Sequence, residues 1–256
     1  MRLIEAIPAT TWSATVPTSE LLPLVLSKRD RLDPEDHAAL SALPVRTERY
    51  EHGATIIPQG PAPNESCLVV AGMSLRTQQL GQSRTIVSAI HIPGDFVDLH
   101  AFLLDELDHS VVAQGRCEVQ FIHSDALREV TRTRPHLTRL LWMSTLIDAK
   151  IHRAWLAASV GLRATERIGH LLSELFVRYQ LIGAVRDGTF RMPLEQKDLE
   201  SLLGYSKTHV NRSVQELRAR GLIDWERNTV TVHQPDTLAD LSKFDPKYLE
   251  LRSAAR

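Results

Sequence analysis

Five polar residues between positions 207 and 212 have side chains that can hydrogen-bond to the edges of nucleic-acid bases. An arginine can donate two hydrogen bonds to guanine, and an asparagine can pair in the same bidentate way with adenine. A lysine, a threonine and a histidine add donors and acceptors that suit bases or phosphates. The cluster consists of Lys207, Thr208, His209, Asn211 and Arg212. It could read a base sequence if one helix presented it to a groove of a duplex.

Two short helices are predicted to position this cluster. The first ends at Gly204, because a glycine readily adopts the left-handed backbone conformation that follows a helix. Ser206 is expected to cap the second helix, which stops at Gly221. Each helix has one apolar face, made by Leu199, Leu202 and Leu203 in the first and by Val210, Val214 and Leu217 in the second. Two such helices joined by a short turn with glycine form a helix-turn-helix, whose second helix enters the major groove of DNA.

A β-hairpin is predicted directly after the second helix. Residues 222–225 and 229–233 alternate like two strands around the turn Glu226-Arg227-Asn228. This hairpin would be the wing of a winged helix-turn-helix. Arg227 at its tip and Ser206 at the start of the second helix are expected to contact phosphate.

The charge of the whole chain gives little sign of a nucleic-acid partner, since the formal net charge is −1. Binding depends instead on where the positive charges lie. Between residues 163 and 221 there are ten lysines and arginines against seven acidic residues. This mild local excess permits DNA binding without proving it.

The part of the chain between positions 45 and 123 has a different residue pattern. Short β-rich runs are separated by glycines at intervals of roughly ten residues between positions 45 and 123, which predicts a small antiparallel barrel or sandwich. The predicted strands contain residues 55–57, 67–70, 85–87, 111–112 and 119–122.

A long helix is predicted over residues 134–158. Seven of its residues recur at steps of three and four, as in a heptad seam: Leu137, Leu140, Ser144, Ile147, Ile151, Ala154 and Ala158. Because the helix is longer than one small barrel needs, we expect this stripe to form a homodimer interface. The alternative is that the stripe faces the chain's own barrel.

These patterns predict an α+β protein with several segments. They are a loosely ordered N-terminal arm (1–30), a β-rich sensor domain (31–133), a dimerisation helix (134–158), a hinge (159–162), a winged helix-turn-helix domain (163–235) and a C-terminal tail (236–256). The tail is amphipathic and is expected to pack on the wing.

From about residue 30 to 235 the chain resembles the Crp/Fnr family of bacterial transcription regulators. Residues 52–60 resemble the family's early barrel glycines, residues 70–75 the next turn, and residues 92–96 the entry to its ligand-binding segment. The string 209–218 looks most like members outside the cyclic-AMP branch. The resemblance implies a double-stranded β-roll sensor, dimerisation through the long helix, a palindromic promoter site and RNA polymerase as a partner.

The sequence departs from the family where cyclic-AMP-binding members hold the nucleotide. Those members have a glutamate on the ribose hydroxyl and an arginine on the cyclic phosphate, and this chain has Leu99 and His109 at these places. Leucine accepts no hydrogen bond, and a neutral imidazole is a poor substitute for guanidinium. We therefore expect a degenerate effector pocket, formed by Asp98, Leu99, His100, His109 and Ser110. Thr208 likewise replaces a glutamate of many members, so the family's best-known half-site is not expected here.

Other functions have weaker support. No nucleophile elbow, phosphate-cradling loop or metalloprotease motif is present, so neither an enzyme nor a catalytic residue is expected. His91, His100, His109 and His123 could ligate haem or a metal, but they lack the spacing of a ligand motif, and we expect no cofactor. The sequence contains no membrane span and no secretory signal, which favours a cytoplasmic protein.

Cys67 and Cys117 are expected to be reduced core thiols. The alternative function is a ligand- or partner-binding module whose winged domain contacts protein instead of DNA.

Overall fold

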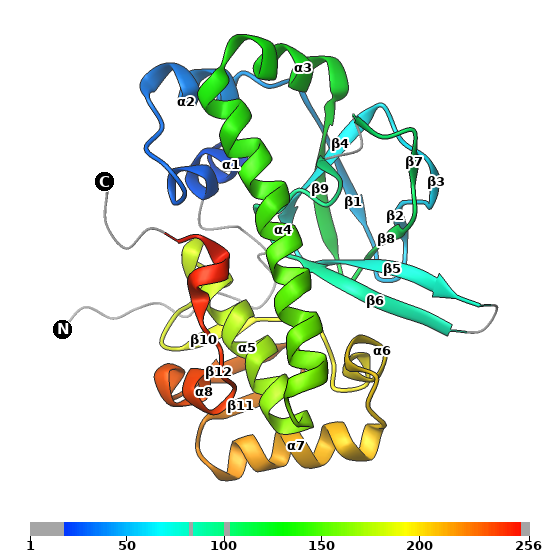
Figure 1. Cartoon of the computed structure of the whole chain (residues 1–256), viewed down its shortest axis with the longest axis vertical. Coiled ribbons are helices and arrows are strands. Elements are labelled where there is room, and N and C mark those ends of the chain that lie inside the picture. The colour runs from blue at the N-terminus through cyan, green and yellow to red at the C-terminus, as the bar shows by residue number, and fades with distance from the viewer. Residues whose placement is uncertain (1–17, 82–83, 100–102, 252–256) are drawn as a thin grey trace.

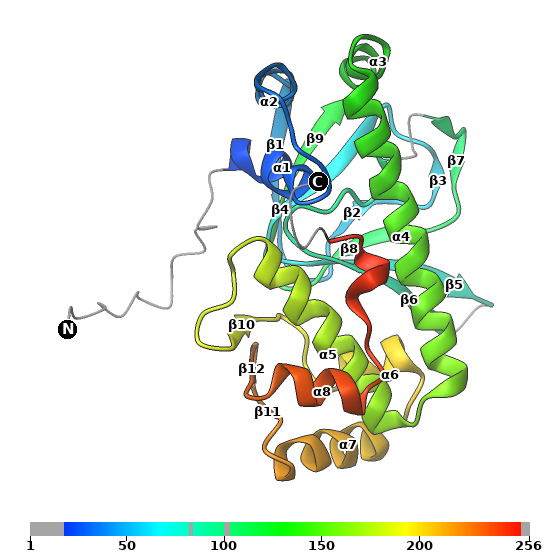
Figure 2. The ribbon, with the colours of Figure 1, turned by 60° about the vertical axis from the view of Figure 1, so that its left-hand side comes forward.

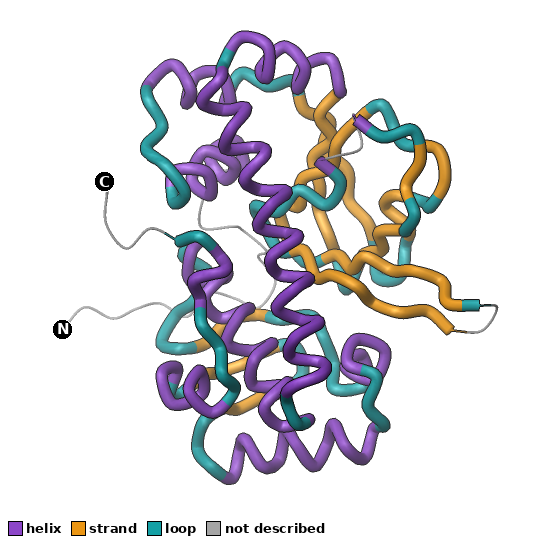
Figure 3. The backbone as a smooth tube through the Cα atoms, in the orientation of Figure 1, coloured by secondary structure: helices purple, strands orange, loops and turns teal. Residues whose placement is uncertain are grey.

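The computed structural model describes residues 18–81, 84–99 and 103–251. Two lobes lie along the long helix α4 (Pro135–Gly161), which runs through much of the length of the molecule (Figure 1). Most strands gather in one lobe, and the other is mostly helical (Figure 3). Residues 1–17 of the predicted N-terminal arm and His100 of the predicted effector pocket lie outside the described residues.

Antiparallel sheets form the N-terminal lobe, and they give the β-roll that the sequence predicted. One sheet has the order β1-β9-β4, and the other has the order β2-β8-β5-β6. Their bounds are Val45–Tyr50 (β1), Thr55–Ile57 (β2), Glu65–Ala71 (β4), Ser74–Leu80 (β5), Arg84–His91 (β6), Ser110–Ala113 (β8) and Cys117–His123 (β9). The short strands β3 (Gly60–Pro61) and β7 (Glu106–Leu107) pair with each other. The sequence missed β1 and β5, because both are rich in polar residues.

The turn between β4 and β5 requires a glycine. Gly72 has a φ of +82°, in the left-handed region that residues with a side chain rarely adopt. A Cβ atom at this position would lie 2.1 Å from the backbone oxygen of Arg116. The tight turn therefore depends on the absence of a side chain.

Apolar side chains from both sheets fill the inside of the roll. The cluster includes Ile57 of β2, Val69 of β4, Val111 of β8 and Val119 of β9. The two cysteines also belong to it: both are buried free thiols, as predicted. Burial raises the pKa of Cys117 to about 12, which keeps this thiol protonated and unreactive.

Helix α1 (Thr18–Ser27) corrects the prediction of a loosely ordered arm over residues 1–30. Its residues Leu21, Leu22 and Leu26 are buried in the main core, together with residues of α4. The prolines of this segment had suggested disorder, but Pro23 lies within the helix. Burial of three leucines outweighs the helix-breaking tendency of one proline. Helices α2 (Pro34–Ser41) and α3 (Ser124–Thr133) complete this lobe.

The C-terminal lobe contains the predicted winged helix-turn-helix. Its elements are α5 (Ala164–Leu181), β10 (Thr189–Arg191), α6 (Asp198–Leu203), α7 (Lys207–Ala219), β11 (Ile223–Glu226) and β12 (Thr229–Val232). The two strands of the predicted hairpin are β11 and β12, and β10 adds a third, in the order β10-β12-β11.

The C-terminal segment packs mainly on α5 and α4, whereas residues 236–256 were expected to pack on the wing. Helix α8 (Pro235–Leu241) packs on α5, and the 3₁₀ helix η2 (Pro246–Leu249) packs on α4 (Figure 2). Phe244 and Leu249 form a small apolar cluster with Ile147 and Ile151 of α4. The chain end thus ties the two lobes to the helix that joins them.

Candidate nucleic-acid interface and sensor cavity

The helix-turn-helix is built as predicted from its apolar residues. Gly204 follows α6 in the left-handed conformation, with a φ of +72°, and donates its backbone N–H to the carbonyl oxygen of Glu200 at 2.9 Å. The inward faces of both helices are buried, and they include Leu199, Leu203, Val210 and Val214. Helix α7 packs on α5 and lies at the end of the molecule farthest from the β-roll (Figure 1).

The polar cluster lies on the outer face of α7, as the sequence predicted. The side chains of Lys207, Thr208, His209, Asn211 and Arg212 are all exposed. The Asn211 amide donates a long hydrogen bond of 3.4 Å to Oε1 of the Gln196 side chain. The cluster is therefore accessible to a ligand as large as a DNA duplex.

Ser206 takes the N-cap position of α7 but does not cap the helix with its side chain. Its backbone is extended, with a φ of −70° and a ψ of 155°, and it makes no side-chain cap hydrogen bond. Its Oγ lies 3.2 Å from Nδ1 of His209 instead. The hydroxyl is exposed, which leaves it able to reach a phosphate.

Arg227 lies at the tip of the hairpin between β11 and β12. Its backbone φ is +50°, and its carbonyl oxygen accepts a 3.1 Å hydrogen bond from the Trp225 indole. The buried Trp225 ring thus fixes the turn while the Arg227 side chain stays exposed.

A second group of cations lies beside the recognition helix, and only its Arg212 was singled out from the sequence. A groove of about 240 Å³ between the start of α5 and α7 is lined by Arg163, Arg212 and Arg220. Arg163 pairs with Glu166 at 2.8 Å, and Arg220 pairs with Glu216 of the same helix. The local excess of basic residues was the only sequence signal for Arg163 and Arg220.

The predicted effector pocket is largely closed in the structure. Asp98 is fully buried, and its Oδ1 accepts a 2.6 Å hydrogen bond from the backbone N–H of Cys67. Burial raises the pKa of Asp98 to about 7. Leu99 is also buried, and Ser110 Oγ accepts a 2.9 Å hydrogen bond from the backbone N–H of Gln59.

The His109 side chain interacts with Asp108, its neighbour in the sequence. Its side chain is buried, and Nδ1 lies 2.7 Å from Oδ1 of Asp108. Burial lowers the pKa of His109, so the imidazole is uncharged near neutral pH. Such a ring offers a phosphate no positive charge.

The face of α4 that was predicted to form a dimer is not the exposed face. Of the predicted seam, Leu137, Leu140, Ile147, Ile151 and Ala158 are buried within the single chain, and Ser144 and Ala154 are half-buried. The five buried residues cannot supply the surface of a dimer. The alternative, that the stripe faces the chain's own barrel, holds only in part, because Leu137 and Leu140 belong to the main core whereas Ile147 and Ile151 pack on the C-terminal segment. The predicted helix also ends too early, since α4 continues to Gly161 and the break falls at residues 162–163.

A different apolar stripe is exposed on α4. It consists of Trp142 (67% exposed), Leu146 (52%), Leu156 (67%) and Val160 (85%). Ala149 and Arg153 lie between Leu146 and Leu156 on the same face. Together the six residues follow one another at alternating steps of four and three. This is the heptad spacing of two helices that pack along their length.

Buried charges connect the two lobes. Arg178 of α5 reaches into the N-terminal lobe and pairs with Asp95 at 2.5 Å and with Glu174 at 3.0 Å. Glu174 also accepts hydrogen bonds from the Trp155 indole at 2.9 Å and from the Tyr248 hydroxyl at 2.7 Å. The network joins the roll, α4, α5 and the C-terminal segment.

The histidines do not form a metal centre in the part of the chain that the structure describes, where no group of three or more potential ligands gathers. His91 lies near Ser74, and His123 near Asp125, so these two rings have separate surroundings. Among the described residues, no helix is long and apolar enough to span a membrane.

A β-roll joined by a long helix to a winged helix-turn-helix defines a class of DNA-binding regulators with a sensor domain. Comparison with known families agrees with this class. Residues 47–134 match the cyclic nucleotide-binding domain, and residues 166–241 match the Crp-like helix-turn-helix domain. The chain belongs to the Crp/Fnr family of transcription regulators, whose members bind DNA, form dimers and are not enzymes.

Individual relatives support the assignment. The chain is 25% identical to the transcriptional activator protein FnrL of Cereibacter sphaeroides, over 77% of this chain and 79% of the relative. FixK2 from Bradyrhizobium japonicum has a similar fold, with a TM-score of 0.69 at 20% identity over 78% of this chain and 98% of that one. The c-di-GMP responsive global regulator CLP from Xanthomonas campestris has a TM-score of 0.57 at 17% identity, covering 74% and 94% of the two chains.

Proposed function

We propose that the protein acts as a cytoplasmic homodimer that binds a palindromic promoter site and influences RNA polymerase there. The exposed polar face of α7 carries the proposal. Its donors and acceptors belong to a rigid helix that is anchored by buried Val210 and Val214. Placed on two helices about one DNA turn apart, such faces read two half-sites of a palindrome.

The DNA contacts divide into two kinds. Asn211 and Arg212 are proposed to read bases, because their side chains can make bidentate pairs in the major groove. Lys207, Thr208 and His209 lie on the same exposed face and are proposed to contribute to the same contacts. Ser206 and Arg227 flank it and are proposed to hold phosphate.

The dimer is proposed to form through the exposed stripe of α4. Four large apolar side chains at heptad spacing are costly to leave in water, and a second copy of the helix would cover them. Trp142→Glu should therefore convert dimers to monomers in analytical ultracentrifugation. Leu80→Glu, which alters an exposed leucine of β5, is the matched control and should leave the dimer intact.

Cyclic AMP is not the proposed effector. Leu99 and the uncharged His109 offer neither the acceptor nor the cation that the nucleotide needs, and apolar side chains fill the roll. Calorimetry should detect no binding at micromolar cyclic AMP. Binding in that range would overturn this part of the proposal.

The experiment that tests the proposed function is selection of bound sequences from a random duplex pool by the purified full chain. An enriched palindrome with half-sites about one turn apart supports a dimeric regulator that needs no added signal. Strongly salt-dependent affinity for duplex DNA would separate this function from the alternative, a winged domain that contacts protein. Absence of binding, even with cell extract added, would contradict the DNA-binding role of this chain.

A further inference from the structure

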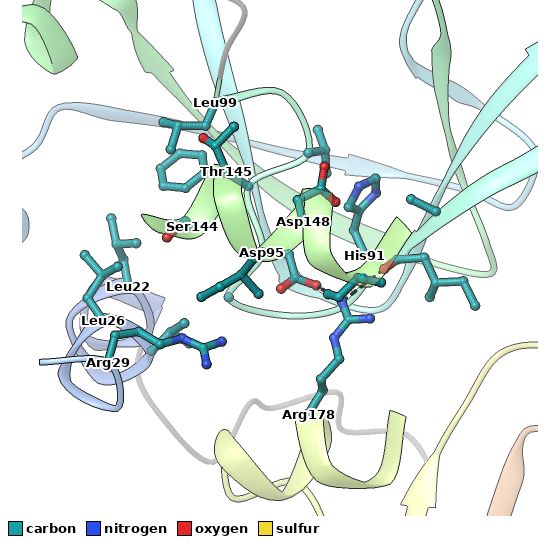
Figure 4. Close-up of a pocket in the computed structure, with 18 of the residues that line it drawn as sticks. Leu22, Leu26, Arg29, His91, Asp95, Leu99, Ser144, Thr145, Asp148 and Arg178 are labelled. Atoms are coloured by element: carbon teal, nitrogen blue, oxygen red, sulfur yellow. Dashed lines mark hydrogen bonds and ion pairs between the residues drawn. The ribbon is translucent and has the colours of Figure 1, made fainter. Parts of the chain in front are cut away.

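A small cavity lies where the roll, the turn after α1, α4 and α5 meet (Figure 4). Its volume is about 60 Å³, enough for a few water molecules or for a solute of about three to five heavy atoms. Its walls include apolar Leu22, Leu26 and Leu99. The charged side chains on its walls are Arg29, Arg76, Asp95, Asp148 and Arg178.

Two of the three arginines on the cavity walls form ion pairs. Arg178 pairs with Asp95 and Glu174, and Arg76 pairs with Asp148 at 3.0 Å. Arg29 has no ion pair among the described residues, and its Nη1 is buried without a hydrogen-bond partner there. Burial lowers the pKa of Arg29 to about 10, and the nearby Asp95 carboxylate offsets this effect only in part. Arg29 is therefore the arginine of this cavity whose charge forms no ion pair among the described residues.

A second unpartnered donor faces the same space. His91 lines the cavity and is only 2% exposed, and its Nε2 has no partner among the described residues. Its Nδ1 lies 3.3 Å from the Ser74 hydroxyl. If that hydroxyl donates to Nδ1, the neutral ring carries its proton on Nε2 and presents an N–H donor. Burial lowers the pKa of His91, so the neutral form is the relevant one.

We propose that this cavity binds a small oxyanion, with Arg29 as its cationic anchor and His91 as a second donor. An oxyanion gives Arg29 an ion-pair partner and accepts hydrogen bonds from both side chains. The size of the cavity restricts the class to small carboxylates and small inorganic oxyanions. A nucleotide is far too large.

The position of the cavity connects the anion to the rest of the molecule. Figure 4 shows Arg29 and Arg178 approaching Asp95 from two sides, one from the turn after α1 and the other from α5. An anion on Arg29 reduces the repulsion between the two arginines and so stabilises the contact between the lobes. Any effect on DNA affinity rests on the proposed function, whereas anion binding does not.

Thermal unfolding of the full chain tests anion binding directly. Formate, acetate, nitrate, sulfate and phosphate are added separately, with chloride at the same ionic strength as the reference. An anion that fits should raise Tm by about 3–5 °C at roughly ten times its Kd, because it binds only the folded state. Stabilisation by formate and acetate alone assigns a carboxylate, and stabilisation by the inorganic ions alone assigns an inorganic oxyanion.

Arg29→Gln should abolish this shift without lowering Tm in chloride, since it removes a largely buried charge that forms no ion pair among the described residues. Arg31→Gln, two residues further on and exposed, is the matched control and should keep the shift. If Arg29→Gln fails to fold, Arg29→Lys retains the charge and should keep part of the shift. The proposal is overturned if no anion exceeds chloride, or if an equal shift persists in Arg29→Gln. Because Tm is measured without DNA, a failure of the DNA-binding proposal would leave this result unchanged.

Discussion

The junction between the lobes and the outer face of α7 both depend on arginine, but in opposite environments. At the junction Arg178 is buried and bonded to two carboxylates, so its charge is used inside the molecule. On α7 Arg212 is exposed, and its charge is available to an external partner. The difference shows that burial and pairing, more than residue type, decide whether a cation holds a fold together or binds a ligand.

The largest effect is expected at the junction. Arg178→Ala should lower the free energy of unfolding by about 3–5 kcal/mol, because Asp95 and Glu174 would lose the cation that they share. Denaturant unfolding measures the change. Arg31→Ala, which removes an exposed arginine, should change stability by no more than about 0.5 kcal/mol. Equal effects of the two substitutions would mean that water reaches the junction.

The opposite pattern is expected on α7. Arg212→Ala should leave stability nearly unchanged but weaken specific DNA binding by about 1–3 kcal/mol if the side chain reads a base. Fluorescence anisotropy on the selected duplex and on a random duplex measures the loss. Arg132→Ala on α3, at the other end of the molecule, controls for the lost charge. Equal losses on both duplexes would instead make Arg212 a phosphate contact.

Asp98 is a third case for comparison, because it is a buried acid that forms no ion pair among the described residues. Its pKa rises to about 7 on folding, so the folded chain binds a proton that the unfolded chain releases above about pH 4. This group therefore lowers stability progressively as the pH rises from about 4 to 7.

Asp98→Asn removes that penalty while keeping an oxygen for the Cys67 N–H. It should be more stable than the original chain by about 1–3 kcal/mol at pH 8, and the gain should vanish near pH 4. Unfolding curves across this range, with Asp105→Asn on an exposed site as the control, measure it. A gain that does not depend on pH would show that titration of Asp98 is not its cause.

The smallest effect is expected at the wing. Arg227→Ala should weaken binding to specific and random DNA equally, by less than about 1 kcal/mol. It should also reduce the slope of log affinity against log salt by about one, as for one phosphate contact. A loss confined to the specific duplex would instead place Arg227 on a base.

Local patterns in the sequence predicted the helix-turn-helix well. Gly204 and the apolar spacing of Val210 and Val214 are constraints that act within a few residues, and the structure keeps them. The strand β1 and the helix α1 were missed for different reasons. Strand β1 was missed because its residues are mostly polar and its partner β9 is distant in the sequence. Helix α1 was missed because Pro23 disfavours a helix, which burial in the main core nevertheless stabilises.

The two stripes of α4 show the limit of such patterns. Only one stripe at heptad spacing was predicted from the sequence, through Leu137 and Ile147, and a second one, through Trp142 and Leu146, was overlooked. Periodicity alone cannot say which one the rest of the chain covers, because it describes one helix and not its neighbours. Packing by the N-terminal lobe and the C-terminal segment covers the first stripe and leaves the second exposed.

The sequence by itself determined the order of the β-rich lobe, the long helix and the helix-turn-helix, and it placed the polar residues on one face of α7. These follow from residue types at fixed short spacing. Only the tertiary structure decided which face of α4 is exposed, that Arg178 joins the lobes, and that Arg29 forms no ion pair among the described residues. Burial and ion pairing between segments far apart in the chain depend on how those segments pack, and no local pattern encodes that.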